Sequence, residues 1–215
     1  MNHYKAVIFD LDGTLLDTLE DLKDSVNAAL RAYGCRERSL DEIRDFVGNG
    51  IRNLLIKAVE GGSEHPEFEN IFQYFQEDYK KNCKNKTKPY DGIMELLWKL
   101  KENGTKLAVV SNKADFAVKD LNLFYFKGLD MIAIGEREGV KRKPSPDVVY
   151  ETLKELQIEK EEAVYVGDSE VDIQTARNAQ IPCLSVLWGF RKKEFLMEQG
   201  GCVFVETPKE LLSLL

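Results

Sequence analysis

The sequence has few cysteines and histidines, and their spacing does not suggest a metal site. Its 215 residues include four cysteines, which form no CxxC pair, and two histidines. Scattered cysteines of this kind are typical of reduced thiols in the cytosol rather than of zinc ligands. No apolar run approaches the roughly 20 residues of a membrane-spanning helix, and the N-terminus, MNHYKAVIFDLDG, lacks the pattern of a signal peptide. We therefore predict a cytoplasmic protein with no membrane partner.

An excess of basic residues is also lacking. Lys and Arg number 30 against 37 Asp and Glu, which gives a net charge of -7. Such a chain repels nucleic acids and anionic membrane surfaces, so a general nucleic-acid binder is not indicated. Any anionic substrate must meet a locally basic site. The composition carries no indication of the oligomeric state.

Short apolar segments of strand length alternate with helical patterns along most of the chain. The segments are Lys5–Leu11, Lys106–Ser111, Met131–Ile134, Ala163–Val166, Pro182–Leu187 and, more weakly, Cys202–Val205. Continuously apolar strands are typical of sheets covered on both faces, and their alternation with helices is typical of parallel βαβ units. The pattern predicts an α/β fold with a doubly wound, mostly parallel, Rossmann-like sheet.

One long segment interrupts this alternation. Residues 17–85 show only helical patterns, and about seventy residues are too many for a simple crossover, which typically spans a dozen or more. We predict an inserted, all-helical domain at 17–85 and an α/β core formed by 1–16 and 86–215. The polar run Asn82–Gly92 has the composition of a linker.

Two aspartates follow the first predicted strand. Asp10 ends the run AVIFD, Asp12 comes two residues later, and Gly13 allows a sharp turn. Ligands of open parallel sheets bind beyond the carboxyl ends of the strands. Two neighbouring carboxylates repel unless a cation or a shared proton intervenes, and Mg2+ favours such oxygen ligands. The alternative is an ordinary turn, with Thr14 capping the next helix.

Polar residues also follow the second and third core segments. Ser111 and Asn112 end the strand KLAVVSNK, where they can donate to phosphate oxygens or cap a helix. Lys143 in KPSPD is kept out of a helix by Pro144, and a fixed lysine suits phosphate binding; the alternative is a solvated basic run.

A fourth strand, in VYVGDSEVDIQTARNA, ends at Gly167 and Asp168. Asp168 and Asp172 are four residues apart and can point the same way if the helix begins near Ser169. Singly, Asp168 is explained as an N-cap and Asp172 as a first-turn acid. The coincidence of polar groups at four successive strand ends favours a functional site.

With these stretches the chain resembles the haloacid dehalogenase superfamily of phosphatases over nearly its whole length. DLDGTLLDT resembles the first family motif, Ser111 the second, Lys143 the third and GDSEVD the fourth. The resemblance implies that Asp10 is the nucleophile that forms an aspartyl-phosphate and that Asp12 is the general acid and base.

The resemblance also implies the remaining site residues. Asp10, Asp12 through its backbone carbonyl, and Asp168 would hold Mg2+, with Asp172 supporting or joining that shell. A further set would bind the phosphoryl group: Thr14, Ser111, Asn112 and Lys143. The helical insert resembles the family's cap, with hinge candidates at Leu16–Asp17 and Lys86–Tyr90.

The expected substrate is a small phosphorylated metabolite. The segment Phe46–Leu55, FVGNGIRNLL, resembles one found in phosphoglycolate phosphatases and places Arg52 early in a helix, where it could receive a carboxylate. The alternative is a glycine-rich turn with a surface arginine. A β-phosphoglucomutase-like activity and a pyrophosphatase remain alternatives, as does a non-catalytic phosphate-binding protein, although the joint presence of all four motifs speaks against the last.

Overall fold

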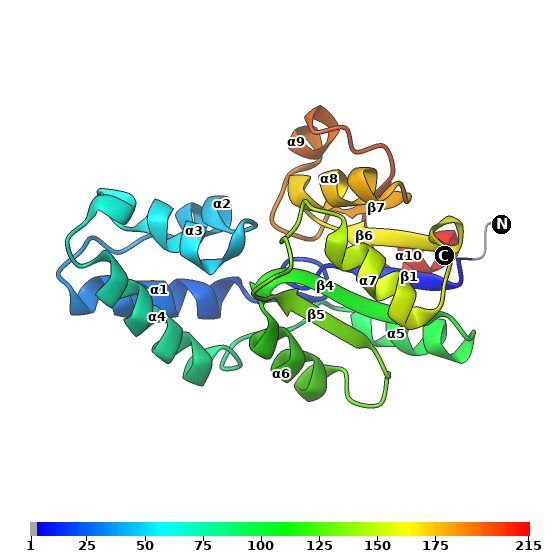
Figure 1. The fold of residues 1–215 in the computed structure, drawn as a ribbon, viewed down its shortest axis with the longest axis horizontal. Helices are drawn as coiled ribbons and strands as arrows, with labels where there is room; N and C mark the ends of the chain where they lie inside the picture. Colours follow the sequence, from blue (N-terminus) through cyan, green and yellow to red (C-terminus); the bar gives the residue numbers. More distant parts are fainter. Residues whose placement is uncertain (1–3) are drawn as a thin grey trace. The chain divides into compact units, whose positions relative to one another are not determined.

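The computed structural model describes residues 4–215, and residues 1–3 at the start of the predicted core lie outside them. The described residues form two compact units (Figure 1). The α/β unit comprises the described residues up to Leu16 together with Pro89–Leu215, and the helical unit comprises Asp17–Lys88.

A six-stranded parallel sheet forms the centre of the α/β unit. The strands are β1 (Ala6–Phe9), β4 (Lys106–Ala114), β5 (Ile132–Glu136), β6 (Ala163–Gly167), β7 (Cys183–Val186) and β8 (Phe204–Val205). Their order is β5-β4-β1-β6-β7-β8, so the chain builds outward from β1 first in one direction and then in the other. The predicted doubly wound α/β fold is confirmed.

Helices lie beside the strands of this sheet, as Figure 1 shows. They are α5 (Ile93–Glu102), α6 (Asp115–Tyr125), α7 (Asp147–Leu156), α8 (Glu170–Ala179), α9 (Lys193–Glu198) and α10 (Pro208–Leu214), with a 3-10 turn η2 at Lys160–Glu162. Alternate residues of β1, β4 and β6, such as Ile8, Val110 and Tyr165, pack in one buried cluster with the apolar faces of α7 and α8. Burial of both strand faces explains why these strands read as continuously apolar.

The helical unit has its own core. It contains α1 (Leu19–Ala32), α2 (Leu40–Phe46), α3 (Gly50–Ala58), η1 (Gly62–Glu64) and α4 (Phe68–Asn82), with α1 and α4 packed side by side. The amphipathic spacing buries residues of α1 such as Val26 and Leu30 and residues of α4 such as Ile71 and Phe75. Helix α2 has no apolar repeat long enough to predict it, and it begins at a capping box in which Ser39 and Glu42 bond to each other's backbone.

Two short strands, β2 (Leu16–Asp17) and β3 (Lys88–Pro89), pair where the chain enters and leaves the helical unit. The second boundary falls after Lys88, three residues later than predicted. The cause is the buried carboxylate of Asp21 on α1, which accepts hydrogen bonds from the backbone N–H groups of Lys86 (3.0 Å) and Thr87 (2.8 Å). These bonds attach both residues to the helical unit.

Among residues 4–215, no helix combines the length and apolarity needed to cross a membrane. The four cysteines are free thiols, as expected.

Candidate active site

The parallel register brings the polar strand ends together. Phe9 pairs with Val109 on one side and with Val166 on the other. The residue directly after β1 is Asp10, whose N–H donates to the carbonyl of Val166 at 2.9 Å. The strand order reverses at β1, and its carboxyl end is the place where ligands of such sheets bind.

Lys143 connects the aspartates that follow β1 and β6. Its Nζ donates to Asp10 Oδ1 at 2.7 Å and to Asp172 Oδ1 at 2.8 Å, and all three side chains are buried. Burial rules out the alternative of a solvated basic run. Tyr165 connects the ammonium group to the sheet. Its hydroxyl accepts from Lys143 Nζ at 3.0 Å and donates to the carbonyl of Val110 on β4 at 3.2 Å.

Asp172 has a second role within its own helix. Its Oδ2 accepts from the N–H (3.1 Å) and the hydroxyl (2.6 Å) of Ser169, the N-cap residue of α8. Asp172 is therefore a first-turn acid, as that alternative predicts. In addition, its Oδ1 accepts a hydrogen bond from Lys143. Both oxygens have hydrogen-bond partners, which suits a residue that supports the site.

Asp168 is held by residues from two loops. Its Oδ2 accepts from the N–H of Phe190 at 2.7 Å, and its Oδ1 accepts from the hydroxyl of Thr14 at 3.3 Å. A Cβ at Gly13 or Gly189 would lie 2.4 or 2.3 Å from Asp168 atoms, so both positions require glycine for this close approach. Asp168 is thus not an N-cap, and Thr14 contacts the aspartate instead of capping a helix.

Three of the predicted residues form a group with the chemistry of a metal site. Asp10, Asp168 and Asp172 offer carboxylate oxygens that all lie within 4.8 Å of one another. Burial raises the pKa of Asp10 from 3.8 to about 7, a rise that Lys143 opposes and Asp172 adds to. Burial, followed by the charges of Asp10 and Asp172, raises the pKa of Asp168 well above its ordinary value. A divalent cation with oxygen ligands would compensate this negative charge, so the donor set fits one.

Asp12 is not a member of this group of three aspartates. Its Oδ1 accepts from Lys113 Nζ at 2.6 Å, and the lysine is 4 % exposed. The site therefore contains two lysine–aspartate pairs, Lys143 with Asp10 and Lys113 with Asp12.

Lys143 stays charged in the folded protein. Burial alone would lower the pKa of Lys143, but the carboxylates of Asp10 and Asp172 raise it well above its usual value, which keeps the ammonium charged.

Ser111 and Asn112 are buried near the end of β4. Because β4 continues to Ala114 and Ala114 is the N-cap residue of α6, neither residue caps a helix. The amide of Asn112 donates to the carbonyl of Lys143 at 3.0 Å, and the Ser111 hydroxyl accepts from the N–H of Lys113 at 3.2 Å. The alternative of a helix cap is wrong, and both residues are linked to a lysine of the site.

Arg52 belongs to the helical unit and has partners there. It forms a bidentate ion pair with Glu69, with Nη1 at 3.0 Å from Oε2, and its guanidinium lies over the rings of Phe68 and Phe72 at 5.2 and 5.1 Å from their centroids. Helix α3 begins at Gly50, so Arg52 does lie early in a helix, as expected, but its guanidinium is already paired with a carboxylate.

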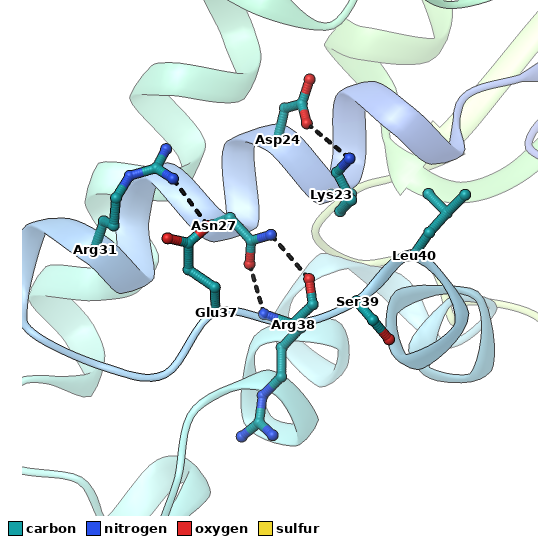
Figure 2. A pocket seen from close by; sticks show the side chains of 8 residues that line it. All are labelled: Lys23, Asp24, Asn27, Arg31, Glu37, Arg38, Ser39 and Leu40. Carbon is teal, nitrogen blue, oxygen red and sulfur yellow. Dashed lines mark hydrogen bonds and ion pairs between the residues drawn. The ribbon is translucent and has the colours of Figure 1, made fainter.

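The helical unit also contains a polar hollow, shown in Figure 2. Each of its basic side chains has an acidic partner: Lys23 pairs with Asp24 at 3.3 Å, Arg31 with Glu37 at 2.8 Å and Arg38 with Glu42 at 3.3 Å. The side chain of Asn27 exchanges two hydrogen bonds with the backbone of Arg38. These internal pairs make the hollow a structural feature of the unit rather than a competing anion site.

Sequence reasoning missed two residues of the site. The strand end SNK gives Lys113 no evident role, and the apolar pattern places Tyr165 only in a core strand. A usable signal existed for Tyr165, because a buried tyrosine hydroxyl normally requires a hydrogen-bond partner. No comparable signal identifies the partner of Lys113, since Asp12 lies about a hundred residues away.

Comparisons with known proteins identify the family of the chain. A family profile described as "Haloacid dehalogenase-like hydrolase" matches residues 7–186. A phosphoglycolate phosphatase of Aquifex aeolicus is 35% identical over 213 residues, which cover 98% of this chain and 96% of that protein. An N-acetylmuramic acid 6-phosphate phosphatase of Pseudomonas aeruginosa is 30% identical over 213 residues, 98% of this chain and 94% of that protein.

Among solved structures, one from Lactobacillus delbrueckii subsp. bulgaricus, provisionally described as a phosphoglycolate phosphatase, superposes with a TM-score of 0.93. It is 36% identical, and the match covers 99% of this chain and 98% of that one. The chain belongs to the haloacid dehalogenase-like hydrolase family. The prediction that it is an enzyme of the phosphatase class is confirmed.

Proposed function

We propose that this phosphatase is a Mg2+-dependent phosphomonoesterase in which Asp10 is the nucleophile and the substrate is a small phosphorylated metabolite such as 2-phosphoglycolate. The observation that supports the nucleophile is the position of Asp10: its buried carboxylate lies at the strand-order reversal, 2.7 Å from a buried ammonium and within the aspartate group. The family relatives support the reaction class.

The residues present can perform the reaction in two displacements. A carboxylate oxygen of Asp10 forms a bond to phosphorus while the bond to the leaving alcohol breaks, and Asp12 gives that alcohol its proton. Water then attacks the phosphorus of the aspartyl-phosphate, Asp12 takes a proton from this water, and the carboxylate of Asp10 is released with phosphate. Lys143 neutralises phosphoryl oxygens beside Asp10, and Ser111 and Asn112 donate to them.

Asp10 and Asp168 would hold the Mg2+ ion, joined by the backbone carbonyl of Asp12 and supported by Asp172. Oxygen-only ligands favour Mg2+ over metals that prefer nitrogen or sulfur. The ion would supply positive charge for the transferring phosphoryl group. Thr14 holds Asp168 through its hydroxyl, so we now assign it to the support of the metal site in place of direct substrate binding.

The proposed substrate class is a small phosphorylated metabolite with a second anionic group. The named activities of the relatives support this class, and the helical unit is the proposed cap domain that would select within it. Arg52 stays a proposed receptor for the second group, on condition that substrate displaces Glu69. We also propose a location in the cytoplasm, which the free cysteines support.

The testing experiment is a steady-state screen with Mg2+ over 2-phosphoglycolate, pyrophosphate, sugar phosphates and nucleotides, with p-nitrophenyl phosphate as a general substrate. We expect the highest kcat/KM for 2-phosphoglycolate, no turnover in excess EDTA and none for Asp10→Asn. A preference for a sugar phosphate with transfer instead of release of phosphate would favour the β-phosphoglucomutase-like alternative, and a preference for pyrophosphate would favour a pyrophosphatase. Absence of any turnover would favour the non-catalytic phosphate-binding protein.

A further inference from the structure

Lys113 forms a buried ion pair with Asp12 but takes no part in the two proposed displacements. Lys113 Nζ lies 2.6 Å from Asp12 Oδ1, and the side chains are 2 % and 14 % exposed, respectively. A lysine this deeply buried is uncommon unless it is paired, because removal of its charge from water costs free energy. Its partner is the proposed general acid.

The backbone around Lys113 is held in place by the neighbouring strand. The register between β4 and β5 shifts between Val110 and Ala114, so the end of β4 is irregular. Gly135 of β5 lies directly against this irregular segment: a Cβ there would be 2.5 Å from the carbonyl oxygen of Lys113 and 2.5 Å from the Cα of Asp115. The N–H of Gly135 donates to Asp115 Oδ1 at 3.0 Å. These contacts fix the position from which the lysine side chain extends.

The ion pair also divides the two oxygens of Asp12 between two tasks. Oδ1 is bound by the ammonium, which restricts rotation of the carboxylate. The other oxygen is the one that would exchange a proton with the leaving group. Lys143 already serves the nucleophile and Asp172, so the two lysines act on different carboxylates.

We propose that Lys113 is a positioning residue that orients the carboxyl group of Asp12 toward the leaving-group oxygen, and that it therefore matters most for esters of poor leaving groups. This inference rests on the proposed role of Asp12. In the first displacement the bond from phosphorus to the ester oxygen breaks, and that oxygen takes the proton of Asp12. Lys113 keeps its own protons throughout.

The leaving group gives a readout that a merely structural lysine would not change. An alkoxide is a strong base and needs the proton, whereas p-nitrophenolate is a weak base and departs without it. The ratio kcat/KM reports the steps up to formation of the aspartyl-phosphate, so it isolates this proton transfer. Loss of orientation should lower kcat/KM for alkyl phosphates and leave that for p-nitrophenyl phosphate nearly unchanged.

The experiment compares Lys113→Met with wild type on 2-phosphoglycolate, ethyl phosphate and p-nitrophenyl phosphate. We expect kcat/KM to fall about 100-fold for both alkyl esters, the lower end of the usual contribution of general acid catalysis, and less than about threefold for the aryl ester. Lys113→Arg, which keeps the charge, should restore most of the alkyl activity. Lys99→Met, at a half-exposed lysine on α5, is the matched control and should leave all three values unchanged.

Two further variants keep the inference falsifiable. In an Asp12→Asn background Lys113→Met should cause no additional loss on ethyl phosphate, because the lysine acts through Asp12. If Lys113→Met does not fold, Lys113→Gln, a neutral side chain of similar length, should show the same dependence on the leaving group.

Equal losses on all three substrates would overturn the proposal, since they indicate a structural or phosphoryl-binding role. A loss confined to 2-phosphoglycolate would also overturn it and would indicate that Lys113 binds the substrate carboxylate. Failure of the proposed function is distinguishable, because Asp10→Asn would then retain activity on p-nitrophenyl phosphate. If 2-phosphoglycolate proves not to be a substrate, ethyl phosphate still decides the role of Lys113.

Discussion

Removal of the charge of Asp10 should stabilise the metal-free protein while it abolishes turnover. The carboxyl group is buried beside two other aspartates, and its pKa rises from 3.8 to about 7 even though Lys143 lies 2.7 Å away. The folded protein therefore disfavours the charged form of Asp10. Asp10→Asn keeps the shape of the side chain and an oxygen that accepts from Lys143, but it removes the charge.

The size and sign of the effect follow from linkage. At about 1.4 kcal/mol for each pKa unit, a rise from 3.8 to about 7 corresponds to about 4 kcal/mol. Because the pKa is raised in the folded state, wild type has its full free energy of unfolding below pH 3.8, where Asp10 is protonated in both states. It loses about 4 kcal/mol of that free energy as the pH rises through about 7. At pH 8 without metal, Asp10→Asn should thus be more stable than wild type by up to about 4 kcal/mol.

The assay is urea unfolding of both proteins in EDTA at several pH values between 5 and 8, repeated with saturating Mg2+. The advantage of the variant should grow with pH in EDTA and should shrink or reverse with Mg2+, because an ion at the proposed site would stabilise wild type. Asp91→Asn, at an exposed aspartate before α5, is the control and should match wild type throughout. Equal pH dependence of wild type and Asp10→Asn in EDTA would refute the reasoning.

Three other substitutions test the supports of the two units. Tyr165→Phe should lower stability by about 1–2 kcal/mol in thermal unfolding and lower kcat, because the hydroxyl links Lys143 to the sheet. Gly167→Ala should lower kcat at least tenfold in the phosphatase assay, since the added Cβ would lie 2.3 Å from Asp172 Cβ; wild-type kcat would contradict this. Asp21→Asn should cost about 1–3 kcal/mol in urea unfolding, because it removes the charge and the Oδ1 that accepts from the N–H of Lys86, and leaves one oxygen for the N–H groups of Lys86 and Thr87. An unchanged midpoint would show that these bonds contribute nothing.

The fold and most of the aspartates could be predicted from sequence because both depend on local patterns. A strand that is buried on both faces is continuously apolar, and a carboxylate at its end, such as Asp10 or Asp168, stands out against that background. The order of strands then brings these ends together without further information. The sequence also placed Arg52 early in a helix and the start of a helix near Ser169, which agree with α3 and α8.

The partners of individual side chains could not be predicted in the same way. Lys113 meets Asp12 only because β4 runs irregularly over Gly135 beside β1, a consequence of register that no local pattern encodes. Arg52 looked free as a receptor because Glu69, its partner, lies seventeen residues away on another helix. Both cases depend on tertiary packing, which overrides what a short segment suggests.

The hydrogen bond of Trp188 to Thr14 places a natural fluorescence reporter beside the site. The chain has two tryptophans. Trp98 on α5 is 41 % exposed, and Trp188 donates its indole N–H to the carbonyl of Thr14 at 2.9 Å, in the loop that also holds Asp168. Dissolved quenchers therefore reach the fluorescence of Trp98 directly, whereas the emission of Trp188 reports on the catalytic loop. With Trp98 replaced by phenylalanine, the folded chain carries a single tryptophan, hydrogen-bonded to the loop that holds Asp168, and needs no attached label.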